Sequence, residues 1–372
     1  MSKKYLVTLK PVDKFFFGGD MTFKVENPSK TKEEDRSSDE RFSSYIIKSN
    51  TFPQQTSLLG MLRFLLLSAS DYFADGKIIN KDGEDGASAL IGSKSFEVSD
   101  ERGQFGCIDE LGACFLLNRS SGGDVYYSFL PYASEYQMAE HDSPILGYVN
   151  GKKMTIPELE GYTAKDGFSK RVIGSDKKVL PLSDIFVEDR RIGIARNIEN
   201  GKTDNSGLFK QISYRFNDFN EENLRIADWH FAFYVTVADE CDLAKYSGWV
   251  VSVGGDNSNF VFSAVADVED IRPDEFQNDK MVVLQSPSYL SADDMQGVKF
   301  FISDTIPFRF MRTSVKDTVD YTLRAGYQRS CRYELYAPGS VFYFNSSKDA
   351  SEFGKALEKY KAFRQIGYNE YK

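Results

Sequence analysis

The sequence contains few residues of the kinds that most often build catalytic and metal sites. Among 372 residues there are four cysteines and two histidines. The cysteines, Cys107, Cys114, Cys241 and Cys331, form no Cys-x2-Cys pair, so the sequence indicates neither a zinc site nor a disulfide framework. We therefore expect reduced cysteines, no bound metal and no cofactor.

Long hydrophobic runs are also absent. The longest run, residues 58–67, is interrupted by Gly60 and Arg63 and is shorter than the roughly 20 residues that a membrane-spanning helix needs. The short apolar stretch at residues 5–9 is followed at once by Lys10, which does not fit a signal peptide. We expect a soluble, cytoplasmic protein with no membrane partner.

The sequence also has no excess of basic residues. The formal net charge of −9 argues against a nucleic-acid binder that acts through an overall basic surface. One segment differs, because residues 305–332 carry six basic residues against two aspartates, with Tyr321 and Tyr327 among them. This mixture would suit phosphate pairing and base stacking. An exposed loop with ordinary surface charges is the alternative.

Aromatic residues, by contrast, are abundant. The chain has 30 phenylalanines and 21 tyrosines, which favours strands over a helical bundle. Each half combines several short strands with one convincing helix, near residues 54–69 and 348–363, so the pattern is α+β. The length suggests two domains. We place the boundary after residue 207, giving domains at residues 1–207 and 208–372.

The strands expected from alternating or continuous apolar residues are short. They are residues 4–12, 113–117, 125–130, 209–216, 229–237, 248–253, 260–266, 281–284, 299–302 and 340–344. Two polar segments, residues 26–41 and 74–100, are expected to be loops that carry at most short pieces of structure.

The stretch from Phe52 to Arg63 is the most informative part of the chain. Pro53 marks a helix start, and the hydroxyls of Thr56 and Ser57 could cap its free amides. Thr56, Gly60 and Arg63 share one face near the positive end of the helix dipole, a combination that suits a phosphate. The alternative is that Gly60 only allows close packing and Arg63 is solvated.

Four islands of sequence together resemble one family. They are residues 9–20 (LKPVDKFFFGGD), 52–63 (FPQQTSLLGMLR), 191–197 (RIGIARN) with 207–209 (GLF), and 325–327 (AGY) with 337–344 (APGSVFYF). Their order and spacing resemble the RAMP proteins of type III CRISPR effector complexes. Within that family the chain is similar to the subunit of the Cmr (type III-B) complex that holds the 5′ tag of the guide RNA. The islands span nearly the whole chain.

The resemblance implies a fold and a set of partners. It implies two ferredoxin-like (RRM-like) modules with long loop insertions, which bind the crRNA 5′ tag together with the large palm-domain subunit and a backbone RAMP subunit. Target RNA would be contacted only indirectly, and the subunit would not be the nuclease. The usual RRM aromatic signature is missing, so stacking of bases on a sheet face is not expected.

The resemblance also implies RNA contacts at the positions that match the family. These are Phe17, Gly18, Gly19, Gln54, Gln55, Thr56, Ser57, Gly60, Arg63, Arg190, Arg191, Arg196, Arg324, Tyr327 and Arg329. Two places depart from the family pattern. A C-terminal glycine-rich loop is present only as Ile366-Gly367-Tyr368-Asn369, and Gly326-Tyr327 stands where a more glycine-rich turn is usual.

An enzyme is the alternative interpretation. A RAMP-type endoribonuclease that processes repeat RNA would use a histidine. His230 lies in a strand pattern and His141 in a polar loop, where packed and surface roles are expected. The run Gly254-Gly255-Asp256-Asn257 resembles the metal-binding turn of palm-type polymerases, but an asparagine replaces its second acid, so we expect a hairpin turn. We predict a non-catalytic RNA-binding subunit with no catalytic residues.

Overall fold

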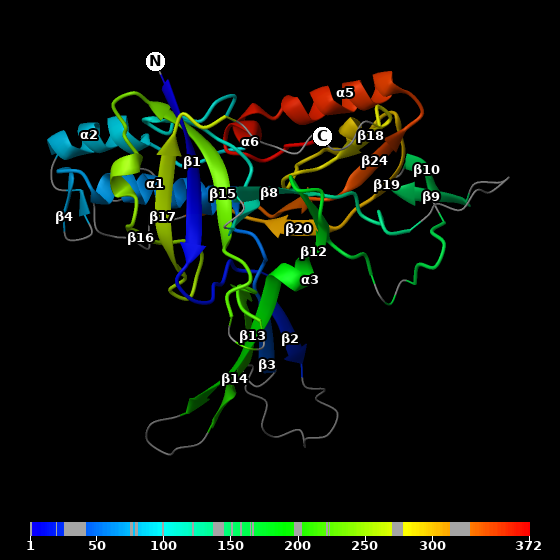
Figure 1. Ribbon diagram of the computed structural model, residues 1–372, viewed down its shortest axis with the longest axis horizontal. Helices are drawn as coiled ribbons and strands as arrows, with labels where there is room; N and C mark the ends of the chain where they lie inside the picture. The colour runs from blue at the N-terminus through cyan, green and yellow to red at the C-terminus, as the bar shows by residue number, and fades with distance from the viewer. Residues whose placement is uncertain are drawn as a thin grey trace, which may run out of the picture.

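The structure is a computed structural model in which a two-part body carries a protruding arm (Figure 1). It describes residues 2–19, 21–25, 42–74, 77–78, 81–98, 100–120, 123–136, 145–149, 152–156, 158–163, 165, 167–196, 203–220, 222, 224–269, 278–312 and 328–372. The loop expected at residues 26–41 and much of the basic segment at 305–332 lie outside these ranges. No helix in the described ranges is long and apolar enough to cross a membrane.

A large sheet forms the first part of the body. Its strands run in the order β12-β11-β8-β7-β15-β1-β17-β16, with β6 also paired to β15, and every pair is antiparallel. The strands are β1 Ser2–Pro11, β6 Ile108–Leu111, β7 Phe115–Ser120, β8 Gly123–Phe129, β11 Arg171–Gly174, β12 Val179–Pro181, β15 Trp229–Ala238, β16 Val250–Ser252 and β17 Asn259–Ala266. Because β1 lies between β15 and β17, the first strand of the chain is held between two strands from its second half.

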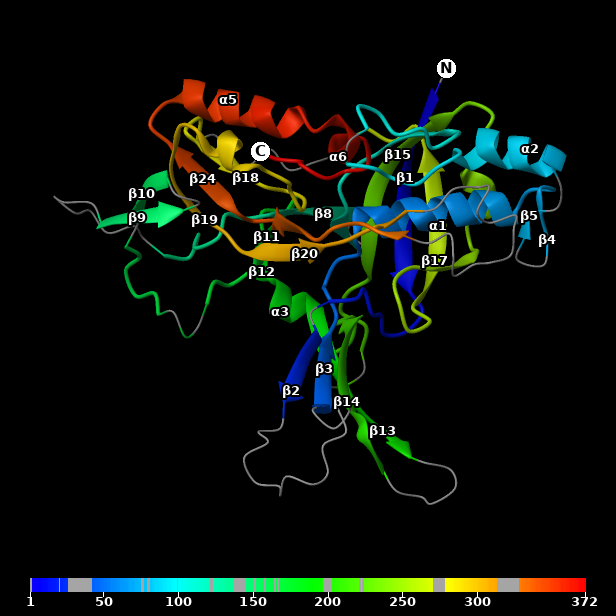
Figure 2. The same ribbon diagram turned by 180° about the vertical axis from the view of Figure 1, so that it is seen from behind.

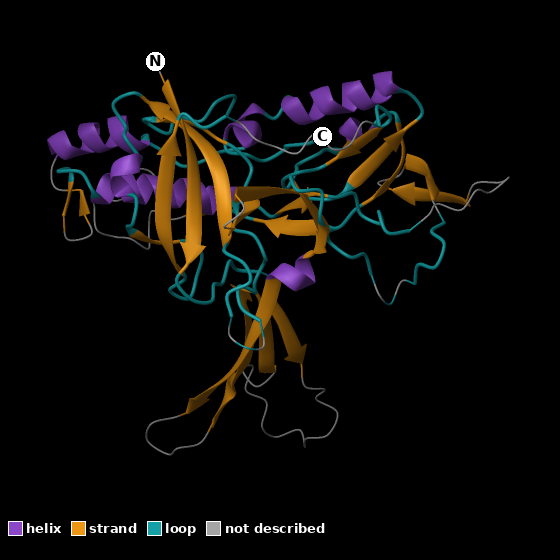
Figure 3. Ribbon diagram, viewed as in Figure 1, coloured by secondary structure: helices purple, strands orange, loops and turns teal. Residues whose placement is uncertain are grey.

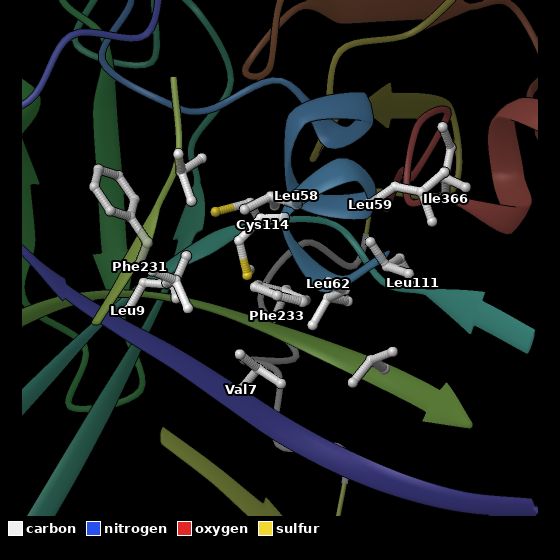
Figure 4. Close-up of a cluster of buried hydrophobic side chains, with 14 of the residues drawn as sticks. Val7, Leu9, Leu58, Leu59, Leu62, Leu111, Cys114, Phe231, Phe233 and Ile366 are labelled. Atoms are coloured by element: carbon white, nitrogen blue, oxygen red, sulfur yellow. The ribbon is translucent and has the colours of Figure 1, made fainter. Parts of the chain in front are cut away.

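Helix α1 (Gln55–Ser68) covers one face of this sheet. Its leucines at helical spacing are buried, as the sequence predicted, and they pack against β1 and β15. Figure 4 shows Leu58 and Leu62 facing Phe233 and Val7 of those strands. The apolar face of α1 therefore packs on the large sheet and forms part of the main hydrophobic core.

Helix α2 (Lys81–Ile91) corrects the prediction of a loop at residues 74–100. It lies beside α1, close to the short strands β4 (Phe73–Ala74) and β5 (Lys77–Ile78). Its glycines and acids give it a weak helix propensity, but Ala87 and Ile91 are buried in the core. A Cβ on Gly86 would lie 2.4 Å from the Tyr72 ring. Tertiary packing therefore outweighs local propensity.

The second part of the body is a small sheet covered by a helix. Strands β18 (Met281–Val283), β24 (Val341–Phe344) and β19 (Val298–Ile302) pack against α5 (Ser347–Glu358), and α6 (Lys361–Gln365) follows. Ser346 caps α5 by accepting a hydrogen bond from the Asp349 amide over 3.2 Å. The helix predicted at residues 348–363 is confirmed, although it is divided into two.

Short strands and turns complete the body (Figure 3). They are β9 Ile145–Val149, β10 Lys152–Ile156, β20 Thr305–Phe308, β21 Met311–Arg312, β22 Gln328–Arg329 and β23 Tyr333–Tyr336, with the 3-10 turns η1 Ala244–Tyr246 and η2 Ala292–Met295. Each predicted strand coincides with an observed one to within a few residues. The α+β class is confirmed.

The arm is a separate four-stranded sheet that extends away from the body (Figures 1 and 2). Its order is β13-β14-β3-β2, and only β14 and β3 are parallel. The strands are β2 Met21–Val25, β3 Phe42–Lys48, β13 Phe186–Arg196 and β14 Thr203–Phe216, and α3 (Leu182–Ile185) leads into β13. The boundary expected after residue 207 falls within β14. The division into two ferredoxin-like modules stays a prediction.

Two cysteines correct the expectation of reduced thiols. Cys107, just before β6, and Cys241, just after β15, form a disulfide with their Cα atoms 6.5 Å apart. Cys114 is a buried free thiol and Cys331 an exposed one. The pair is 134 positions apart in the sequence, and only the pairing of β6 with β15 brings the two residues together. No short-range spacing could have revealed it.

Candidate functional site

A groove runs between the base of the arm and the body. Residues 48–55 connect β3 to α1 and line two adjoining cavities, of about 560 and 260 Å³. Both cavities are lined by Asn50, Thr51, Lys170 and Leu182, so they adjoin each other. We call the larger one the arm cavity, the smaller one the inner cavity, and the two together the groove.

The arm side of the groove is cationic. Arg190, Ile212 and Lys48 lie in register across β13, β14 and β3, on one face of the arm. Lys48 Nζ is 2.9 Å from Glu188 Oε1, and Arg190 Nη2 is 2.7 Å from Glu188 Oε2. The hydrogen bond from Lys48, followed by that from Arg190, lowers the pKa of Glu188. One carboxylate thus faces two cations, which leaves positive charge on this face.

The opposite side of the groove carries Lys170. Its ammonium lies 2.9 Å from Asp304 and 5.8 Å from the centre of the Tyr132 ring. Both partners of this ion pair are substantially exposed, so the pair is weak and easily exchanged for a bound anion. The groove therefore has lysines on both of its walls.

The predicted Gly18-Gly19 turn supports the rim of the groove. The Asn50 amide donates to the Gly18 carbonyl over 3.0 Å, and Gly18 has a φ of +64°. A Cβ on Gly19 would lie 1.8 Å from the Lys48 carbonyl oxygen, so only glycine allows this approach. Phe17 is buried in the core, and its amide donates to Ser49 Oγ over 2.9 Å.

The start of α1 borders the inner cavity, but its amides are covered. Gln54 lines the cavity, while the buried Gln55 donates to the carbonyls of Gly112 and Ile366, each over 2.8 Å. The hydroxyl of Tyr368 lies beside the amides of Gln55 and Thr56, and burial raises the pKa of Tyr368. The C-terminal segment thus occupies the position where the sequence predicted an anion. Ser57 is half-buried one residue further on.

Gly60 and Arg63 lie away from the groove, further along α1. Arg63 Nη2 donates to the carbonyl of Gly92 over 3.1 Å, next to the C-terminus of α2. Burial lowers the pKa of Arg63 to about 10. Gly60 is exposed, with open space where a Cβ would stand. In this structure Arg63 therefore interacts with the negative end of α2.

The remaining predicted arginines are dispersed. Arg191 lies on the other face of the arm from Arg190, with its Nε 3.6 Å from Asp189. Arg329 is exposed on β22 in the body. Arg196 is the last residue of β13, and the structure does not describe its side chain. Arg324 and Tyr327 lie outside the described residues.

Sequence reasoning missed the residues that shape the groove. Lys48, Lys170, Tyr132 and Tyr214 come from four separate segments and match no motif. These residues share one feature, which is that they lie beside residues 49–53 in the folded protein. That feature appears only when β3, β14 and the loop before β11 have folded together. The available signal was the position of Lys48 shortly before the conspicuous start of α1.

The groups considered for catalysis are placed as packed residues. His230 is buried within β15, with its Nε2 3.2 Å from Asp228 Oδ1. His141 lies outside the described residues. Residues 254–257 form a turn between β16 and β17, as predicted, and Asp256 accepts a hydrogen bond from Gln211 over 3.0 Å. Among the described residues, no three His, Cys, Asp or Glu side chains are placed to hold a metal.

These features define an α+β protein with a groove at the base of a β arm, where Lys48 and Arg190 flank one carboxylate on the arm side and Lys170 lies on the opposite side. Residues 7–371 match the family described as CRISPR-associated protein (Cas_Cmr3), and the chain belongs to this family. The predicted resemblance to a subunit of the type III-B (Cmr) complex is thereby confirmed.

Two solved structures contain chains similar to this one. A chain in the cryo-EM structure of type III-B Cmr-beta bound to cognate target RNA and AMPPnP (state 1) is 14% identical, with a TM-score of 0.47 over 98% of this chain and 95% of that chain. A chain of type III-B Cmr-beta bound to cognate target RNA is also 14% identical, with a TM-score of 0.45 over 99% and 96%. No curated protein matches the sequence.

Proposed function

We propose that this chain is the non-catalytic crRNA-binding subunit of a type III-B effector complex and holds the 5′ tag of the guide RNA in the groove. It acts in the cytoplasm, docked on the large palm-domain subunit and a backbone RAMP subunit, and contacts target RNA only indirectly. Membership of the Cas_Cmr3 family supports the assembly. The lysines on both walls of the groove are the observation that carries the RNA site.

A local cationic groove explains how an acidic chain can bind RNA. Phosphate contacts supply most of the affinity of RNA-binding proteins, and they need only a few well-placed cations. Lys48, Arg190 and Lys170 supply these charges, and the Tyr214 ring adds an aromatic surface in the arm cavity. The acidic remainder of the surface keeps RNA away from other sites.

The predicted contacts divide into two groups under this proposal. Gln54 lines the inner cavity, Gly18 and Gly19 contact the lining residues Asn50 and Lys48, and Arg190 pairs with the lining Glu188. These four would meet the RNA at the groove. A second group would be reached only by RNA or subunits that extend beyond the groove. Its members are Thr56, Ser57, Gly60, Arg63, Arg191, Arg196, Arg324, Tyr327 and Arg329.

The endoribonuclease alternative finds little support in His230. A general acid or base must reach the 2′-hydroxyl or the leaving oxygen of the RNA. His230 is 7% exposed, and burial lowers its pKa, so it is a neutral packed group at pH 7. Cleavage of repeat RNA by the purified chain, lost in His230→Ala, would favour the alternative.

The proposal is tested by isolating the complex. The chain is co-expressed with its neighbouring genes and purified by affinity, and the 5′ ends of the co-purifying RNA are mapped. We expect one short, uniform 5′ sequence, depleted in a Lys48→Ala/Arg190→Ala double variant and retained in Arg191→Ala, which alters the other face of the arm. An intact complex without such RNA would contradict the proposal.

A further inference from the structure

We propose that the inner cavity holds one nucleobase turned out of the RNA strand, with the Tyr132 hydroxyl contacting the polar edge of the base. The inference rests on the proposed function, because the strand must lie in the groove. The phosphate contacts would recognise the RNA backbone, whereas this contact would recognise a base.

The shape of the cavity suits a flat ring. Its volume of about 260 Å³ is just below the roughly 300–1,000 Å³ of most small-molecule sites, and it is large enough for a ring system. Phe52 and Phe129 line it, with ring centres 5.2 Å apart, together with four prolines. Such flat, apolar surfaces pack well against the faces of a base.

The chemistry of the cavity favours a neutral group over a phosphate. Its charged lining residues are one lysine and one aspartate, Lys170 and Asp304, so the lining carries no net charge. Deeper inside, the lining side chains include Cys114 and Tyr132, both buried. A base presents apolar faces and uncharged donors and acceptors, which match such a lining.

Tyr132 provides the observation that points to a ligand. Its side chain is 2% exposed, and its hydroxyl has no hydrogen-bond partner among the described residues. A buried hydroxyl without a partner is costly, so its retention needs an explanation. The Tyr132 amide donates to the Gly339 carbonyl over 2.8 Å, which anchors the main chain, and the Phe168 ring stacks on the Tyr132 ring with their centres 6.3 Å apart. A base in the cavity would supply the missing partner.

The cavity is accessible from the RNA path. Asn50, Thr51 and Lys170 line both cavities, so a strand in the arm cavity passes the opening of the inner one. Because Lys170 lines both cavities, it would meet the phosphate next to the inserted base. Single-stranded RNA is commonly read in this way, by splaying out a base while the backbone stays outside.

The test compares RNA with and without bases. The full-length chain is titrated with a 3′-fluorescein RNA carrying the mapped 5′ sequence, and with a series in which each nucleotide in turn is abasic. We expect one abasic position to weaken binding to the wild type. Tyr132→Phe should bind the intact RNA about fivefold more weakly, the effect of one neutral hydrogen bond, and should bind that abasic RNA as the wild type does.

The controls separate this inference from the proposed function. Tyr126→Phe makes the same chemical change in a buried tyrosine that packs in a different cluster, away from the cavity, and should leave all affinities unchanged. Tyr132→Phe should not lower the thermal stability, because it removes a hydroxyl that has no partner. Binding that falls in Lys48→Ala/Arg190→Ala and is unchanged in Tyr132→Phe overturns the base pocket alone. An intact wild-type complex that retains no RNA overturns both proposals. Tyr132-dependent binding of free AMP, GMP, CMP or UMP without RNA assigns the cavity to a free nucleotide instead.

Discussion

The side chain of Gln55 donates a hydrogen bond to the carbonyl of Ile366 over 2.8 Å, although the two residues are 311 positions apart. The same amide group donates to the carbonyl of Gly112. Three distant segments therefore meet at the start of α1, which borders the inner cavity. This contact explains why the glutamine that begins α1 is buried, and it makes the C-terminal segment part of the support for the groove.

Replacing Gln55 should destabilise the fold. In Gln55→Ala two buried carbonyls lose their donor, and each unsatisfied acceptor costs roughly 1–3 kcal/mol. We expect the free energy of unfolding to fall by about 3 kcal/mol, measured by urea denaturation. Gln54→Ala is the control, because its side chain makes no capping hydrogen bond and is half-buried. Equal stability of the two variants would contradict the role of Gln55.

Gly367 should not tolerate a side chain. Its φ of +83° disfavours other residues, and a Cβ would lie 2.1 Å from Gln55 Nε2 and 2.4 Å from the Gly112 carbonyl oxygen. Gly367→Ala should therefore cost about 2 kcal/mol or more. Gly248→Ala has a similar φ of +91° with open space around it, so it should show the conformational cost of about 1 kcal/mol alone. Thermal unfolding of both variants measures the difference, and a milder effect at Gly367 would refute the packing.

Much of the local structure could be predicted from the sequence, because it depends on short-range patterns. The leucines of α1 follow helical spacing, and the turn at residues 254–257 has the glycines and asparagine of a hairpin. Strand β3 was missed because it directly follows a polar segment, and α2 was taken for a loop because its glycines and acids form a helix only through packing with distant segments.

The site was predictable only in part, for the same reason. The Gly18-Gly19 turn and Arg190 do contact residues that line the groove, since their roles follow from local sequence. The sequence could not show which of Arg190 and Arg191 faces the groove. Neighbours in a strand lie on opposite faces, and only the partner strands decide which face meets the groove. Lys170 gave no local signal, since its place depends on long-range folding.

The disulfide predicts a definite thiol count. Of the four cysteines, Cys114 and Cys331 are free, so unreduced protein in denaturant should react at two thiols, and at four after reduction. Because the bond closes a loop of more than 100 residues, the Cys107→Ser/Cys241→Ser variant should lose about 3 kcal/mol of stability. Cys114→Ser, which leaves the bond intact, is the control for thiol count. Four reactive thiols without reductant would show that the bond is not formed.

His230 predicts how stability depends on pH. Burial lowers its pKa below the usual 6.5, and this outweighs the Asp228 carboxylate, which raises it. The unfolded chain therefore binds a proton more readily than the folded one between the lowered pKa and 6.5. The free energy of unfolding should fall as the pH drops from 7.5 to 5.5, by less than about 1.4 kcal/mol per pH unit.

The control for this pH dependence is His230→Gln, which removes the titrating group. Urea denaturation at each pH should give a flatter profile for the variant than for the wild type. Asp228 and Asp294 also have lowered pKa values, but they titrate below the range of the measurement. Parallel profiles for the two proteins would show that His230 is not the group responsible.

Arg190 and Arg191 provide a matched pair for testing the RNA site. They are neighbours in the sequence with similar exposure, but only Arg190 lies on the groove face beside Lys48. Each phosphate contact releases counterions, so losing one contact lowers the slope of log affinity against log salt by about 1. Arg190→Ala should show this loss when binding of the mapped RNA is followed by fluorescence anisotropy over a series of salt concentrations, and Arg191→Ala should not. Because both variants remove one positive charge, a general effect of net charge would lower both slopes equally, and that result would move the RNA away from this face of the arm.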